Sequence, residues 1–105
     1  MLLRKEKGLG AYMDFDLGVY NFTKRELRVR QEALDGCVSA GDVEGAVEWL
    51  RVILELINKI PLKNFAYRDM REYAISFYRD CIRRVFSLGV PLDERYYVVR
   101  GESIK

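Results

Sequence analysis

Few residues of this sequence are able to do chemistry, and histidine is missing altogether. Histidine is the only side chain that normally changes charge near neutral pH, so the usual general base and the commonest zinc ligand are missing with it. Glu44 and Glu48 are one helical turn apart, as in dimetal carboxylate sites, but those sites also use a Glu-x-x-His motif on neighbouring helices. Asp14 and Asp16 would share one face of an extended chain, which is a weak pattern for a divalent cation. We therefore expect no catalytic residue, no metal site and no cofactor, and a protein that is not an enzyme.

The two cysteines, Cys37 and Cys81, are too few for a zinc finger or a disulfide framework. Both fall on the inner faces of predicted helices, which favours small buried side chains. A disulfide between those helices is the alternative. A nucleophilic role is disfavoured, because no base near neutral pH is present to activate a thiol.

The length of 105 residues is enough for one domain, and a composition of 50% hydrophobic and 32% charged residues suits a globular protein. A net charge of +2 is too small to indicate a polyanionic partner by itself. The sequence has no stretch long and apolar enough to span a membrane, and residues 1–7 lack the apolar core of a signal peptide. We expect an intracellular, cytoplasmic protein, or a virion component if it is a coat-type subunit. Scarce amide side chains beside many charges are typical of a hyperthermophile.

Three regions are distinguished along the chain. Residues 1–22 contain Gly8, Gly10 and Gly18, and residues 13–20 alternate between apolar and other side chains, which predicts an extended N-terminal arm. Residues 23–91 read as a helical domain. Residues 92–105 form a C-terminal tail whose pattern fits either a short strand or a helical turn.

The helical domain is predicted to be a small all-α three-helix bundle, an antiparallel hairpin followed by a long third helix. Thr23 and Glu26 have capping-box spacing, which predicts a first helix over 24–40. Gly41 suits the end of that helix, and Asp42 can cap a second helix over 43–60 that Pro61 stops. The polar stripe of the second helix is narrow, which predicts a central position. The third helix is expected over 65–88.

Residues 41–50 resemble the turn and second helix of a tetratricopeptide repeat, with Ala46 and Leu50 at matching positions. Leu34 and Asn58 stand where that family carries its Gly and Pro, and the chain has a single copy. Repeat proteins need about three units to bury their faces. We therefore interpret the segment as a generic antiparallel hairpin.

Aromatic residues outside the predicted helices indicate a partner surface, because Tyr is enriched at interfaces. The candidate interface residues are Tyr12, Phe15, Tyr20, Tyr96 and Tyr97. The favoured function is a non-enzymatic protein–protein interaction or self-assembly module, with a second copy or another protein as partner and no small-molecule substrate. Packing of these segments across the monomer's own helices is the alternative.

Basic residues support a second hypothesis, a nucleic-acid-binding nucleoprotein or coat-type structural subunit. Its candidate contacts lie on the third helix: Arg68, Arg71, Arg79 and Arg83. Acidic residues interleave with them, which also fits an ordinary solvated face. Residues 31–60 have an excess of acidic side chains and the flanking regions an excess of basic ones, so copies could pair head to tail.

Overall fold

The computed structural model describes residues 16–105, which are mostly helical, as the sequence predicts. The helices are α2 (Leu17–Ser39), α3 (Val43–Asn58), α4 (Leu62–Phe65) and α5 (Arg68–Phe86). A short 3₁₀ helix, η1 (Glu94–Tyr97), precedes the two strands β1 (Val98–Val99) and β2 (Glu102–Ser103). Of the arm predicted for residues 1–22, residues 1–15 lie outside the described part of the chain.

Helix α2 begins seven residues before the predicted start at residue 24, so the prediction of an extended chain is wrong for 17–22. Asp16 caps the helix, and its Oδ1 accepts a hydrogen bond from the Val19 N–H at 3.1 Å. Thr23, predicted as the cap, is a buried residue inside the helix. The apparent alternation over 17–20 is too short to separate a strand from the first helical turn, and the Asp16 cap decides between them.

The hairpin between α2 and α3 follows the predicted signals. Gly41 has a φ of +71°, a conformation that glycine adopts without a steric penalty. Asp42 caps α3 by accepting a hydrogen bond from the Gly45 N–H at 3.0 Å. A Cβ at Gly45 would collide first with the Asp42 carboxylate and would also lie 2.9 Å from Cys37 Sγ, so this glycine leaves room both for the cap and for the close approach of α2.

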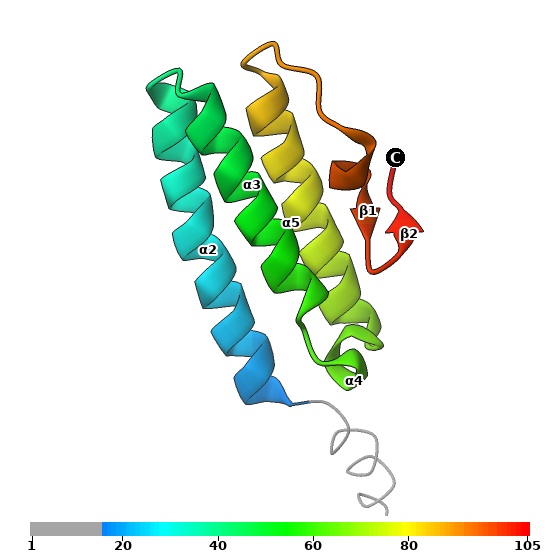
Figure 1. Cartoon of the computed structure of the whole chain (residues 1–105). Helices are drawn as coiled ribbons and strands as arrows, with labels where there is room; N and C mark the ends of the chain where they lie inside the picture. The colour runs from blue at the N-terminus through cyan, green and yellow to red at the C-terminus, as the bar shows by residue number, and fades with distance from the viewer. Residues whose placement is uncertain (1–15) are drawn as a thin grey trace, which may run out of the picture.

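Helix α3 lies between α2 and α5 and packs against both of them and against β1 (Figure 1). Ala46, Leu50, Ile53 and Ile57 lie at a spacing of three or four residues and have no exposed surface. These contacts with both α2 and α5 agree with the narrow polar stripe of this segment.

The predicted third helix is two helices in the structure. α4 ends at Phe65, and α5 begins at Arg68 after Tyr67, whose backbone is extended. Asn64 is fully buried at this break, and its side chain is hydrogen-bonded to the backbone of Asp16. These bonds hold α4 against the start of α2. A single helix over 65–88 is therefore wrong at its first turn, because a tertiary contact, which propensity does not report, fixes α4 as a separate turn.

The tail contains both of the local structures that its sequence allowed. After η1, β1 and β2 form an antiparallel pair with Val98 opposite Ser103 and Val99 opposite Glu102. Tyr78 of α5 donates a hydrogen bond from its hydroxyl to the Tyr96 carbonyl at 2.6 Å. Tyr96 and Val99 are buried, so the tail covers the helices of its own chain (Figure 1).

Candidate interaction surfaces

The three described residues of the predicted aromatic interface pack largely against their own chain. Tyr20 lies on α2, half-buried, with its ring centroid 6.4 Å from that of Tyr73. Tyr97 is half-buried, with Lys105 Nζ 5.1 Å from its ring centroid. Tyr96 is only 6% exposed, because the tail folds back onto α5. Tyr12 and Phe15 lie outside the described residues.

A different apolar surface, which the sequence reasoning missed, lies on the outer side of α2. Phe22 is 53% exposed and Val29 57% exposed. At 100° per residue, Phe22, Val29, Ala33 and Gly36 fall within an arc of about 60°, and no charged residue of the helix falls inside it. A Cβ at Gly36 would meet nothing within 4 Å, so this part of the face is open. We call these four residues the α2 stripe.

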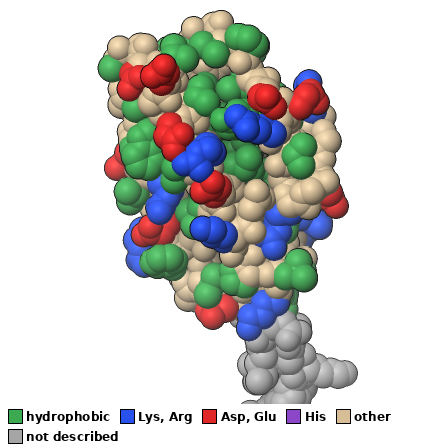
Figure 2. All heavy atoms as spheres, in the orientation of Figure 1, with side chains coloured by type: hydrophobic (Ala, Val, Ile, Leu, Met, Phe, Trp, Pro, Cys, Tyr) green, Lys and Arg blue, Asp and Glu red, His purple; other side chains and the backbone are tan. Residues whose placement is uncertain are grey.

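The spacing of Phe22 and Val29 was the available signal for this stripe. Residues seven apart share one side of a helix. With the helix predicted to begin at residue 24, Phe22 fell outside it and the pair was not recognised. Figure 2 shows other apolar side chains, in green, scattered between charged ones on one face of the molecule. Single exposed apolar residues of that kind are normal on a protein surface.

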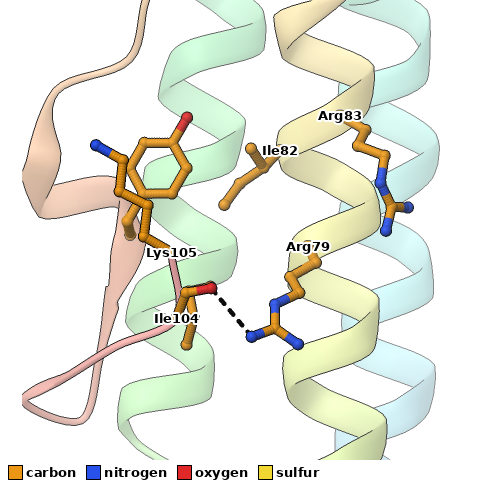
Figure 3. Close-up of a pocket in the computed structure, with 6 residues that line it drawn as sticks. Arg79, Ile82, Arg83, Ile104 and Lys105 are labelled. Atoms are coloured by element: carbon orange, nitrogen blue, oxygen red, sulfur yellow. Dashed lines mark hydrogen bonds between the residues drawn. The ribbon is translucent and has the colours of Figure 1, made fainter.

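A groove runs along α5 beside the C-terminal strands and is formed by three adjoining hollows. Arg71 and Ile75 line both of the first two hollows. Arg79 lines one of these two and also the third hollow, and Ile104 lines the other one and also the third. The third hollow, of about 260 Å³, lies between α5 and the tail, with Arg79 and Lys105 on opposite sides of it (Figure 3). We call this feature the α5 groove.

The structure brings three of the four predicted nucleic-acid contacts to this groove. Arg71, Arg79 and Arg83 line it, and Arg79 Nη2 donates a hydrogen bond to the Ile104 carbonyl at 3.0 Å (Figure 3). Arg83 extends away from Lys105 and pairs with Asp80 at 3.3 Å. Arg68 does not line any of the three hollows and pairs with Glu72.

Arg100, which sequence reasoning did not single out, holds the lower wall of the groove. Its backbone has a φ of 52°, and its Nη1 donates to the Ile57 carbonyl at 3.0 Å and the Asn58 carbonyl at 3.1 Å. These carbonyls end α3, where a positive charge is favourable. Its guanidinium carbon also lies 4.4 Å from the ring centroid of Phe65, a cation–π contact. No local pattern in the sequence pairs residue 100 with the end of α3.

Neither cysteine is arranged for chemistry. Both are free thiols. Burial raises the pKa of the Cys81 thiol to about 12. Desolvation, with the nearby Asp42 carboxylate adding to it, also raises the pKa of Cys37. Both thiols are thus protonated at neutral pH, the opposite of an activated nucleophile.

Six carboxylates of the described chain form ion pairs with arginine. Arg84 joins α2 to α5, because its Nη1 bonds both oxygens of Asp35 at 2.6 and 2.7 Å while its Nη2 bonds Asp80 at 2.8 Å. Glu48 lies on α3 and pairs with Arg51. Within residues 16–105, no group of three or more Cys, Asp or Glu side chains is placed to hold a metal ion.

Comparison of the chain with models of protein families, with curated proteins and with solved structures finds no match. Among residues 16–105, no helix combines the length and the apolar character needed to cross a membrane.

Proposed function

We propose that this protein is a non-enzymatic protein–protein interaction module that assembles with copies of itself. The observation that carries the proposal is the α2 stripe, in which Phe22 and Val29 are more than half exposed within an arc of about 60° that contains no charged residue, on the longest helix of the described chain. In this proposal α2, α3 and α5 act as a three-helix bundle that presents the stripe.

The chemistry of the stripe suits a second helix. Fully burying an apolar side chain of this size contributes about 1.5–3 kcal/mol, so Phe22 and Val29 lose a substantial gain while they face water. Ala33 and Gly36 have little or no side chain, which leaves room for a neighbouring helix at the close end of the usual spacing of about 8–10 Å.

The test is the mass of the protein in solution across a concentration series, measured by light scattering. The double variant Phe22→Glu/Val29→Glu places charges in the stripe, and we expect it to weaken self-association at least about tenfold. Phe86→Glu is the matched control, because Phe86 is 57% exposed at the far end of α5. Equal masses for the wild-type protein and the double variant at every concentration would remove the stripe as the assembly surface.

A second candidate, binding of nucleic acid by a nucleoprotein or coat-type subunit, is favoured by one observation. Arg71, Arg79 and Arg83 follow one another along the α5 groove, and Lys105 lies across it from Arg79. Cations in a row can follow a phosphate backbone. Such binding releases counterions from the nucleic acid, and it weakens steeply as the salt concentration rises because that release then gains less free energy. Anisotropy of labelled single-stranded and duplex DNA at two salt concentrations tests it, and salt-independent or undetectable binding would count against it.

A further inference from the structure

The groove along α5 contains arginines whose charge is not neutralised within the described chain. Among residues 16–105, no carboxylate lies within ion-pair distance of Arg71 or Arg79. The hydrogen bond from Arg79 to the Ile104 carbonyl positions its guanidinium but leaves the positive charge uncompensated. Both arginines are exposed, and they lie eight residues apart on one side of α5.

Between these arginines the groove is lined by Ile75 together with Ser76 and Glu72, and the Glu72 carboxylate is already paired with Arg68. Ile75 lies between Arg71 and Arg79, and Leu62, which is 75% exposed, lies at the α4 end of the groove with Ile104 opposite. The aromatic rings beside the groove are already covered, because Arg100 lies against Phe65 and Lys105 against Tyr97. Unstacked bases bind single-strand proteins mainly by stacking on free aromatic faces. The groove therefore suits a segment with carboxylates and aliphatic side chains better than a nucleic acid.

Such a segment exists at the α2–α3 end of this same chain. Residues 31–50 contain five carboxylates and no lysine or arginine. Four of the five are exposed: Glu32, Asp42, Glu44 and Glu48. Among the described residues, Glu32 and Glu44 form no ion pair, and the partly exposed Val43 and Val47 lie beside Glu44. We call residues 31–50 the acidic tip, and it lies at the upper left of Figures 1 and 2.

We propose that the acidic tip of one copy docks in the α5 groove of a second copy, so that Glu32 and Glu44 meet Arg71 and Arg79. This inference rests on the proposed self-assembly, and it names a pair of surfaces through which the copies make contact. Tip and groove are different surfaces of one molecule, so the contact is heterologous and can repeat from copy to copy into a ring or an open chain. Ala33 and Gly36 of the α2 stripe lie within the acidic tip, whereas Phe22 and Val29 lie outside it and serve a second contact.

Charge reversal with rescue tests this contact. The groove variant is Arg71→Glu/Arg79→Glu and the tip variant is Glu32→Lys/Glu44→Lys, neither of which breaks an ion pair of the described chain. Opposed like charges disfavour docking, so each variant alone should associate at least about tenfold more weakly than the wild-type protein. An equimolar mixture of the two should recover association, because reversed grooves meet reversed tips and native grooves meet native tips. Arg28→Glu is the control, because Arg28 is exposed on α2 away from the α2 stripe and the groove, and it should behave as wild type.

Sedimentation velocity across a concentration series gives the readout, at ionic strengths of about 0.01 M and 0.15 M, where the Debye length is about 30 Å and 8 Å. Docking between charged surfaces should weaken at the higher value. Circular dichroism checks that each variant is folded, and Arg71→Gln/Arg79→Gln replaces the groove variant if the reversed one is not.

Two results overturn the inference and leave the proposed self-assembly standing. One is a mixture that stays as dissociated as its two components. The other is that both charge variants associate as strongly as the wild-type protein while Phe22→Glu/Val29→Glu dissociates. A groove variant that loses only its binding to a single-stranded oligonucleotide is one case of this second result. A wild-type protein that is monomeric under every condition overturns the proposed self-assembly and this docking together.

Discussion

The side-chain amide of Asn64 is hydrogen-bonded to both backbone groups of Asp16. Its Nδ2 donates to the Asp16 carbonyl at 3.0 Å, and its Oδ1 accepts from the Asp16 N–H at 3.2 Å. Asn64 has no exposed surface, and the two residues are 48 positions apart in the sequence. These two hydrogen bonds hold the first turn of α2 against α4.

Replacing Asn64 should loosen that first turn. Asn64→Leu keeps a similar volume but removes both hydrogen bonds, and leaving a partly buried N–H without an acceptor costs about 1–3 kcal/mol. Urea unfolding should show the loss, and amide hydrogen exchange should accelerate most at residues 19–21. Asn21→Leu, at an exposed position of α2, is the control and should change stability by less than about 0.5 kcal/mol. Equal effects at the two positions would show that the Asp16 contact contributes nothing.

Two glycines in the hairpin should respond to alanine in opposite directions. Gly45→Ala forces a Cβ against the capping carboxylate of Asp42 and to within 2.9 Å of Cys37 Sγ, and such overpacking costs about 1–3 kcal/mol. Gly36→Ala meets nothing within 4 Å, and replacing a helical glycine by alanine stabilises by about 0.5–1 kcal/mol. Thermal unfolding at low protein concentration compares them. A stabilising Gly45→Ala would mean that the two helices are farther apart than described.

Tyr78→Phe should detach the tail without disturbing the helices. The variant removes the hydroxyl that donates to the Tyr96 carbonyl and leaves that buried carbonyl unpaired, a loss of about 1–3 kcal/mol. Tyr73→Phe is the matched control, because the half-buried Tyr73 hydroxyl forms no hydrogen bond within residues 16–105. Proteolysis that cleaves the tail of Tyr78→Phe faster than that of Tyr73→Phe would agree with this role, and equal cleavage rates would contradict it.

Stability should fall in alkaline solution because of Cys81. Burial raises its pKa to about 12 in the folded protein, whereas an unfolded thiol titrates near 8.5. Above the unfolded value the unfolded chain releases a proton that the folded protein retains, so the free energy of unfolding decreases as pH rises. The decrease approaches about 1.4 kcal/mol per pH unit for this one group and stops at the folded pKa.

Urea unfolding of the wild-type protein and Cys81→Ala between about pH 8.5 and 10, below the usual tyrosine range, isolates this contribution. The alanine variant should show the shallower dependence, whatever its stability at neutral pH. Parallel curves for the two proteins would indicate that Cys81 is accessible enough to ionise in the folded state.

Local signals predicted the middle of the fold better than its ends. Gly41 and Asp42 specify their turn through backbone conformation and capping, which depend only on neighbouring residues. The start of α2 was misplaced because Thr23 and Asp16 both qualify as caps, and the contact with Asn64 favours Asp16. The tail was left ambiguous because the Tyr78 contact that holds it crosses between elements.

The candidate surfaces follow the same division. The spacing of Arg71, Arg79 and Arg83 placed them on one helix in advance, and the structure adds the opposite wall of the groove. Arg100 could not be predicted, because its role depends on the carbonyls of Ile57 and Asn58, more than 40 residues away. The α2 stripe was within reach of sequence reasoning and was lost through an error in a single helix boundary.

The position of Arg100 also has a consequence for the order of assembly. During synthesis, the final turn of α3 leaves the ribosome 43 residues before the guanidinium that bonds its Ile57 carbonyl. Until then the Ile57 carbonyl has its local partner, the Ile60 N–H at 3.2 Å, but not the cationic side chain. The last turn of α3 and the C-terminal strands should therefore become ordered together in one late step. A nascent chain that stops before residue 100 should have a frayed C-terminal end of α3.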